Sequence, residues 1–329
     1  MKITSSISVL AAAALGVAVL GLGPVQASQD KPVIIMVSGP LTDPFFSAVK
    51  KGFDDAAAAM KVDAQYSTIS TFDNVQSDLV HLVEASASRR PDALIVGDFF
   101  PDAMDPAIKA AVAQGTAVII HNSGEQSWKS DGALTYIGED PRAMGAASGE
   151  LAVKNGVKFG LCVDHVPGNP ALEQRCSGYE DALKKIGGGA KVLSISTQDA
   201  QNPQANLQAI KGALQADPKI NGILTLGATQ TAIAVQAVRE QGLKGKVTIG
   251  ATDLSSAGLA AEKVGDVAFL VDQQAYLQGF YSVVVAAQYV KYGLHPIGEI
   301  HTGPLVVTKD NIDRIIEVDK KYGGIRGAQ

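Results

Sequence analysis

The sequence predicts an α/β protein built from two doubly wound parallel sheets. Short, uniformly apolar, β-branched runs alternate with helical patterns, which is typical of parallel strands covered by helices on both faces. These runs fall into two series along the chain. A chain of about 300 residues also exceeds what one hydrophobic core usually supports, so we expect two domains of this kind.

The strands of each series are predicted from these apolar runs. The first series comprises Val33–Val37, Ala64–Ser67, Leu94–Val96 and Val118–Ile120. The second comprises Phe159–Val163, Val192–Ser196, Ile223–Leu226, Val247–Ile249 and Phe269–Val271. The segments between them carry the helical period, and Val75, Leu79, Leu82 and Val83 share one helical face.

Helix starts are predicted where a capping side chain stands directly before a proline. Such a pair suits a helix N-terminus, because the side chain caps a backbone N–H and proline has none to leave unpaired. The pairs are Asp43-Pro44, Asp105-Pro106, Asp140-Pro141 and Asn202-Pro203. They would follow the carboxyl ends of strands, where open parallel sheets bind ligands.

Residues 1–27 are predicted to be a secretory signal peptide. Lys2 precedes an apolar run from Ile7 to Leu22, and Pro24 precedes the small-residue exit that ends at Ala27. We expect cleavage after Ala27 and a mature protein that acts outside the cytoplasm. The alternative is an uncleaved anchor, because the run is only slightly shorter than a membrane span.

The charge of the mature chain argues against nucleic-acid or membrane-surface binding. Loss of the leader removes one basic residue and no acidic one, which leaves 27 basic and 33 acidic residues. A mildly acidic chain without a basic block offers no electrostatic attraction to phosphates.

No motif of cofactor or catalytic chemistry is found. A dinucleotide fingerprint, a P-loop, a G-x-S-x-G elbow and an H-E-x-x-H pair are all absent, and the histidines lack metal-ligand spacing. We therefore expect no cofactor, no metal and no catalytic residue. A secreted hydrolase, the rival class, would have to use Asp43, Asp98 or Asp253 without an ordered histidine.

Two cysteines, Cys162 and Cys176, are predicted to form one disulfide. An even pair separated by a short loop is typical of a disulfide in an oxidising compartment. Closing a loop of this size stabilises a fold by about 3 kcal/mol in the chain-entropy model. The alternative is a pair of buried thiols.

The loop Ser38–Phe46 is a candidate ligand-binding segment. Adjacent helical residues point about 100° apart, so Phe45 and Phe46 cannot both face the helix–sheet core. An aromatic ring in a cleft can stack on the C–H face of a sugar while Asp43 accepts hydrogen bonds from hydroxyl groups. The alternative is a hydrophobic staple with an ordinary helix cap.

The segment P-L-T-D-P-F-F-S-A-V-K-K-G, residues 40–52, resembles the N-terminal signature of type I periplasmic sugar-binding proteins of the ribose- and galactose-binding group. Further matches occur in order at residues 117–122, 168–175, 249–253 and 271–279. Each is weak by itself, but together they cover essentially the whole mature chain.

This resemblance implies two Rossmann-like lobes joined by a three-crossing hinge. The crossings would fall near Gly138–Asp140, Asp272–Gln273 and Thr302–Gly303. The N-terminal lobe would comprise residues 28–138 and 274–302, and the C-terminal lobe residues 139–273 and 303–329.

The resemblance also implies a set of ligand-binding residues. Asp43, Phe45, Phe46, Asp98 and Asn122 would line the N-terminal lobe, and they would be faced by Asn169, Arg175, Asp253 and Gln273. Alternatives remain for single residues: Asp253 could cap a helix, Arg175 could lie on an ordinary helix surface, and His165 is more typical of a solvated loop.

Two departures from the family pattern bear on the ligand. Gly227 and Ala228 stand where relatives carry an Asn-Asp pair, and Ser123 stands where a ribose binder has arginine. These losses argue against ribose and leave another pentose, a hexose or a polyol. A second aromatic pair, Phe99-Phe100, is expected near the cleft, where stacking would compensate.

The resemblance implies a periplasmic receptor, not an enzyme. It would act as a monomer that captures a small neutral carbohydrate by lobe closure and delivers it to the permease of an ABC transporter. Alternatives are the same receptor serving chemotaxis or sensing, and a non-sugar ligand. A transcriptional regulator would need a DNA-binding helix pair where the leader stands.

Overall fold

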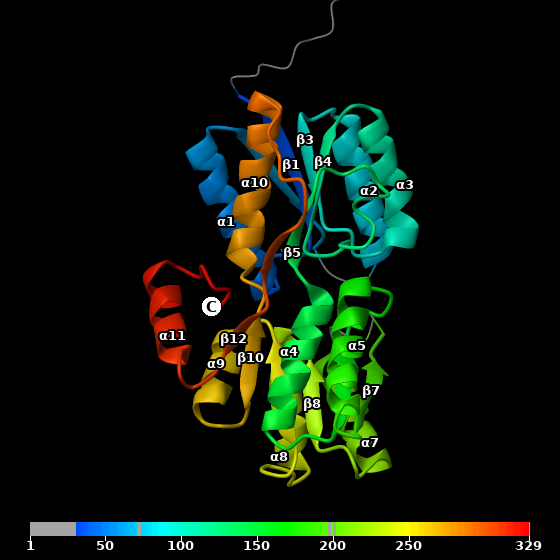
Figure 1. Cartoon of the computed structure of the whole chain (residues 1–329), viewed down its shortest axis with the longest axis vertical. Coiled ribbons are helices and arrows are strands. Elements are labelled where there is room, and N and C mark those ends of the chain that lie inside the picture. The colour runs from blue at the N-terminus through cyan, green and yellow to red at the C-terminus, as the bar shows by residue number, and fades with distance from the viewer. Residues whose placement is uncertain (1–30, 71–73, 197–198, 200–201, 329) are drawn as a thin grey trace, which may run out of the picture.

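The computed structural model describes residues 31–70, 74–196, 199 and 202–328, in two lobes that lie end to end (Figure 1). The predicted signal peptide, residues 1–27, lies outside the described residues. Each lobe contains a six-stranded sheet with helices on both faces. The α/β fold class predicted from the alternation of strands and helices is confirmed.

The first sheet has the strand order β11-β5-β4-β3-β1-β2, and its pairings are all parallel. Its strands are β1 (Val33–Ser38), β2 (Asp63–Thr68), β3 (Ala93–Val96), β4 (Ala117–His121), β5 (Tyr136–Glu139) and β11 (Ile300–Gly303). Helices α1 (Pro44–Met60) and α10 (Ala275–Tyr292) pack together on one face, and α2 (Val75–Ser88) and α3 (Pro101–Ala113) pack together on the other (Figure 1).

The second sheet has the order β12-β10-β9-β8-β6-β7 and is parallel except for β12. Its strands are β6 (Phe159–Asp164), β7 (Gly189–Ser194), β8 (Gly222–Thr225), β9 (Thr248–Thr252), β10 (Phe269–Asp272) and β12 (Leu305–Val307). The helices of this lobe are α4 (Pro141–Lys154), α5 (Pro170–Lys184), α7 (Pro203–Ala216), α8 (Ala228–Glu240), α9 (Ser256–Lys263) and α11 (Ile312–Lys321).

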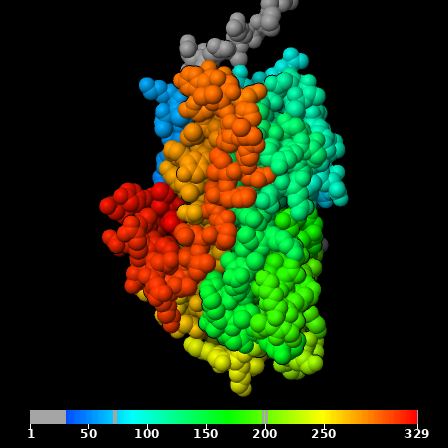
Figure 2. Space-filling view, in the orientation of Figure 1, coloured from blue at the N-terminus to red at the C-terminus, as the bar shows by residue number. Residues whose placement is uncertain are grey.

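The chain passes between the two sheets at three places in the described residues. It leaves the first sheet after Glu139, returns to that lobe after Asp272, and leaves again after Gly303. The C-terminal segment lies beside the junction of the lobes on the face shown in Figure 2. There Arg326 forms an ion pair with Asp272.

All the strands predicted from apolar runs are present, but one is displaced. The run Val192–Ser196 was expected as a strand, whereas β7 spans Gly189–Ser194 because its register against β6 begins at Gly189 opposite Phe159. Strands β5, β11 and β12 were not predicted. Strands β5 (Tyr-Ile-Gly-Glu) and β11 (Ile-His-Thr-Gly) contain glycine and polar residues, and β12 has only three residues, so none of them forms a distinctive apolar run.

Three of the four predicted helix caps are confirmed. Asp43, Asp140 and Asn202 each accept a backbone N–H in the first turn of α1, α4 and α7. The prediction at Asp105-Pro106 is wrong, because Pro106 lies inside α3, which begins at Pro101. The helix is already established there, since the carbonyl of Phe100 accepts N–H groups from the following turn.

No helix in the described part of the chain is both long and apolar enough to cross a membrane.

Candidate functional site

A pocket lies between the lobes at the carboxyl ends of both sheets. It is lined by Asp43, Phe45, Phe46, Val75, Phe99, Phe100, Asn122, His165, Val166, Asn169, Leu172, Arg175, Leu226, Gly227, Asp253 and Gln273. Most of these residues follow strand ends or begin helices, which is the position that parallel sheets offer to ligands. Every predicted binding residue except Asp98 is among them.

Four phenylalanines form the aromatic part of the pocket. Phe45 and Phe46 meet edge to face with ring centroids 5.0 Å apart, and Phe46 meets Phe99 in the same way at 5.8 Å. Phe46 also requires a glycine at position 39, because a Cβ there would lie 2.2 Å from its ring. Phe100 completes the set, so the second aromatic pair lies at the pocket as expected.

A chain of polar side chains connects the lobes at one end of the pocket. Asn122 donates to Gln273 Oε1 at 3.0 Å, and Gln273 donates in turn to Asp253 Oδ1 at 2.5 Å. Ser123 donates to Asn169 Oδ1 at 3.0 Å across the same cleft. These planar amide and carboxylate groups present directed donors and acceptors to whatever fills the pocket.

Asn122 and Asp253 share an unusual backbone geometry. Their φ angles are 62° and 70°, in the left-handed region that non-glycine residues rarely adopt. Such conformations gather at functional sites, where the surrounding fold enforces them. The alternative that Asp253 caps a helix is wrong, because Ser255 caps α9 by accepting the Gly258 N–H.

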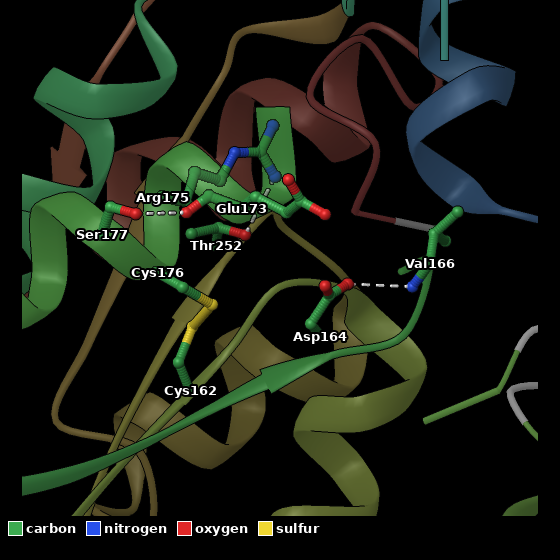
Figure 3. Close-up of a disulfide and its surroundings, with 8 residues drawn as sticks. All are labelled: Cys162, Asp164, Val166, Glu173, Arg175, Cys176, Ser177 and Thr252. Carbon is green, nitrogen blue, oxygen red and sulfur yellow. Dashed lines mark hydrogen bonds between the residues drawn. A yellow bond between two sulfur atoms is a disulfide. The ribbon is translucent and has the colours of Figure 1, made fainter. Parts of the chain in front are cut away.

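Arg175 is buried on α5, with only 2% of its surface exposed, so the ordinary surface alternative is wrong. Its Nε donates to Glu139 Oε1 at 3.1 Å, and its Nη2 pairs with the same oxygen. Its Nη1 lies 3.5 Å from Thr252 Oγ1 (Figure 3). The guanidinium is therefore held by residues of both lobes.

The predicted disulfide between Cys162 and Cys176 is confirmed, with 5.6 Å between the Cα atoms. It ties β6 to α5 one residue after Arg175 (Figure 3). Asn169 caps the start of the same helix by accepting the Ala171 N–H at 3.0 Å. The cap and the disulfide together fix the helix that carries the polar side of the pocket.

Desolvation in the cleft shifts the titration of its ionisable groups. It raises the pKa of Asp253 to about 7, although Arg175 and the Gln273 amide oppose the shift. It also raises the pKa of Asp43, which the Phe45 N–H opposes. Desolvation, together with the nearby charge of Arg175, lowers the pKa of His165 to about 4.

His165 lies at the pocket and not in a solvated loop as expected. Its Nδ1 is buried and has no hydrogen-bond partner in the described part of the chain, and its Cε1 and Nε2 lie close to Gly227. A residue with a side chain at position 227 would overlap the imidazole, since a Cβ there would lie 2.9 Å from Cε1. Glycine at that position therefore makes room for His165.

Asp98 does not line the pocket, which corrects its predicted role. Phe99 and Phe100 turn into the pocket, while the fully buried Asp98 packs against Gly124 and accepts a hydrogen bond from Ser127 Oγ at 2.5 Å. Its carboxylate lies within 4.8 Å of those of Asp105 and Asp131. Burial raises the pKa of Asp98 to about 7.

Glu139 is the residue that sequence reasoning missed. It ends β5, is fully buried and lies behind Arg175 without itself lining the pocket. Its signal in the sequence was slight: an acidic residue directly before the capping pair Asp140-Pro141. Val75, Leu172 and Leu226 were also not predicted to line the pocket. Apolar side chains at strand ends and helix starts usually belong to the hydrophobic core, so the sequence does not distinguish them.

The chemistry of the pocket suits a neutral, hydroxyl-rich ligand. Aromatic faces can stack on C–H groups while amides, carboxylates and the guanidinium bind hydroxyl groups in pairs. The described lining residues include no serine, threonine, cysteine or lysine that could act as a nucleophile.

Comparison with known proteins identifies related chains. Residues 34–294 match the family model described as "Periplasmic binding protein domain". The xylose/arabinose-binding protein XylF of Sulfolobus acidocaldarius is 24% identical over 88% of this chain and 74% of its own length. The D-ribose/D-allose-binding protein of Pseudomonas aeruginosa is 27% identical over 79% of this chain and 82% of its own length.

Among solved structures, a carbohydrate transporter from Acidothermus cellulolyticus 11B in complex with myo-inositol superposes with a TM-score of 0.81. It is 29% identical in sequence, and the match covers 90% of this chain and all of that one.

Proposed function

The chain belongs to the periplasmic binding protein family, and on this premise we propose that it is the solute-binding protein of an ABC transporter for a monosaccharide or an inositol. It binds its ligand and releases it unchanged to the permease. The observation that carries this proposal is the pocket between the lobes, where aromatic faces stand opposite a chain of planar hydrogen-bonding groups.

The composition of the pocket narrows the ligand. Gly227 lines it without a polar side chain, and the Ser123 hydroxyl is directed to Asn169. Two polar side chains fewer than in the family pattern, together with four phenylalanine rings at the pocket, favour a ring with apolar C–H faces and hydroxyl groups around its edge. The relative that binds myo-inositol supports a hexose or cyclic polyol over ribose.

The location and domain division remain part of the proposal. Residues 1–27 act as a signal peptide and the mature protein works in the periplasm as a monomer. The lobes comprise residues 28–138 with 274–302 and residues 139–273 with 303–329, and they close on the ligand about the three crossings. Some contacts with the ligand form only when the lobes are closed. The binding energy of these contacts drives the closure.

A ligand screen tests the proposal. Residues 28–329 are heated with ribose, xylose, arabinose, glucose, galactose or myo-inositol, and hits are titrated by calorimetry. A ligand present at 100 times its Kd stabilises the protein by about 2.7 kcal/mol, which gives a clear rise in Tm. We expect at least one neutral carbohydrate other than ribose to do so.

A pair of arginine variants locates the binding. Arg175→Ala is expected to reduce affinity by at least a hundredfold, since it removes a buried charged donor. Arg142→Ala removes an exposed guanidinium on the neighbouring helix, paired with Asp181, and should bind normally. Absence of binding by every neutral carbohydrate, or chemical conversion of one, contradicts the proposed function.

A further inference from the structure

Glu139 and Arg175 form a buried pair directly behind the pocket. Glu139 is 0% exposed and Arg175 is 2% exposed, and their contact joins the end of β5 to α5. One carboxylate oxygen, Oε1, accepts from both Nε and Nη2 of the arginine, whereas Oε2 has no hydrogen-bond partner among the described residues. The pair lies at the first crossing between the lobes.

The contact leaves part of the guanidinium for a ligand. A guanidinium has five N–H groups. Two are directed to Glu139, and a third lies toward Thr252 Oγ1. The remaining two N–H groups belong to the terminal nitrogens Nη1 and Nη2. Arg175 can therefore donate two hydrogen bonds to a ligand, while the carboxylate of Glu139 offsets its charge.

The charge of the pocket follows from this pairing. The charge of Arg175 is offset by Glu139 and also acts on Asp253, so the acidic groups outnumber the one arginine. Asp43 is a further acidic group with no ion pair to another described lining residue. His165 is neutral, because burial and Arg175 lower its pKa to about 4. An anionic ligand would therefore enter a site with no free positive charge, and like charges in a desolvated site repel strongly.

We propose that Glu139 determines the ligand specificity of this protein: by neutralising Arg175 from behind, it makes the pocket accept neutral polyols and reject their sugar-acid counterparts. The inference rests on the proposed function. Glu139 touches no ligand and acts through Arg175, so it is a positioning residue. We expect substitution of Glu139 to strengthen the binding of sugar acids. A variant that had merely lost structure would not gain affinity in this way.

The experiment compares matched neutral and acidic sugars by calorimetry at pH 7.5. The pairs are glucose with glucuronate and galactose with galacturonate, in which a carboxylate replaces only the C6 hydroxymethyl group of the same ring. We expect the wild-type protein to prefer the neutral member of any pair that it binds by at least about a hundredfold. In Glu139→Gln the freed charge of Arg175 should narrow this preference by at least about tenfold.

Two further variants test whether the preference depends on the carboxylate paired with Arg175 or on any negative charge nearby. Glu125→Gln removes a carboxylate close to Glu139 that pairs with His301 at 3.2 Å and does not touch Arg175, so it should keep the wild-type preference. Glu139→Asp keeps the charge and should keep the preference as well. An unchanged preference in Glu139→Gln, or equal narrowing in Glu125→Gln, overturns the inference.

The outcomes distinguish the two proposals. If the wild-type protein binds a neutral sugar and also binds its acid within tenfold, the inference fails while the proposed function stands. That comparison needs no variant and decides the matter even if Glu139→Gln does not fold. If the wild-type protein binds no neutral carbohydrate at all, both proposals fail.

Discussion

Asp253 illustrates how single residues set the behaviour of the pocket. It follows β9 with a left-handed backbone, and its carboxylate accepts a hydrogen bond from Gln273. Desolvation raises its pKa to about 7, so near neutral pH the acceptor is only partly ionised. A ligand that donates hydroxyl groups to this carboxylate favours the ionised form.

Binding should therefore depend on pH. The complex holds fewer protons than the free protein, because ligand hydroxyls lower the pKa of Asp253, and affinity must then rise with pH below about 7. The increase is at most tenfold per pH unit and levels off above pH 7. Calorimetry between pH 5 and 8 with a neutral sugar measures it.

Two asparagine variants test whether this pH dependence comes from Asp253. Asp253→Asn has no group to titrate and should show a nearly flat profile. Asp98 has a pKa of about 7 as well but lies outside the pocket, so Asp98→Asn should keep the slope. A wild-type affinity that stays constant from pH 5 to 7 contradicts the role given to Asp253.

At the level of elements, the position of α5 depends on close contact with α4. Gly145 on α4 faces the backbone of α5, and a Cβ added there would lie 2.1 Å from the carbonyl oxygen of Arg175. Gly178 on α5 faces α4 in the same way, with 2.4 Å to the carbonyl oxygen of Arg142. Small residues thus let the helix that carries Arg175 approach the first crossing.

Gly145→Ala is expected to displace α5. Backbone cannot give way as a side chain can, so the helices must separate, at a cost of about 1–3 kcal/mol in the free energy of unfolding. The shift should also weaken sugar binding, because Arg175 moves with its helix. Denaturant unfolding and calorimetry measure the two effects.

Gly212→Ala is the matched control for this substitution. Gly212 is exposed on α7 with open space around its Cβ position, so alanine should stabilise the helix by about 0.5–1 kcal/mol and leave binding unchanged. A Gly145→Ala protein as stable as Gly212→Ala would show that the contact between α4 and α5 does not matter.

On the scale of the whole molecule, polar contacts join the two lobes at the cleft. Ser123 to Asn169 joins the first lobe to α5, and Asn122 to Gln273 joins it to the second crossing. These neutral hydrogen bonds stabilise by only about 1 kcal/mol each. The buried ion pair of Glu139 with Arg175 also joins the lobes, at the first crossing. On the proposed function, the ligand sets the balance between open and closed forms.

Small-angle scattering tests lobe closure. Addition of a sugar identified in the screen should reduce the radius of gyration of the wild-type protein, because the ligand draws the lobes together. Arg175→Ala at the same sugar concentration should keep its ligand-free radius. A wild-type radius that does not change on saturation argues against closure as the response to ligand.

Most of the fold was predictable because its signals are local. Apolar runs mark the central strands, and the side chains of Asp43, Asp140 and Asn202 cap the helices that they precede. Local signals failed where pairing between distant segments decides. Strands β5 and β11 contain glycine and polar residues, and β12 has only three residues, so no apolar run marks them. Strand β7 takes its limits from its pairing with β6.

By itself, the sequence determined the α/β class and the cysteine pair, because alternating apolar runs and a short cysteine spacing are local signals. Its resemblance to type I periplasmic sugar-binding proteins implied most of the residues that line the pocket. Only the tertiary structure decided where those side chains point. Asp98 turns away while its neighbour Phe99 turns in, and His165 enters the pocket over Gly227. The pairing of Arg175 with Glu139 joins residues 36 positions apart, and such contacts depend on distance in space and on burial, which no local pattern records.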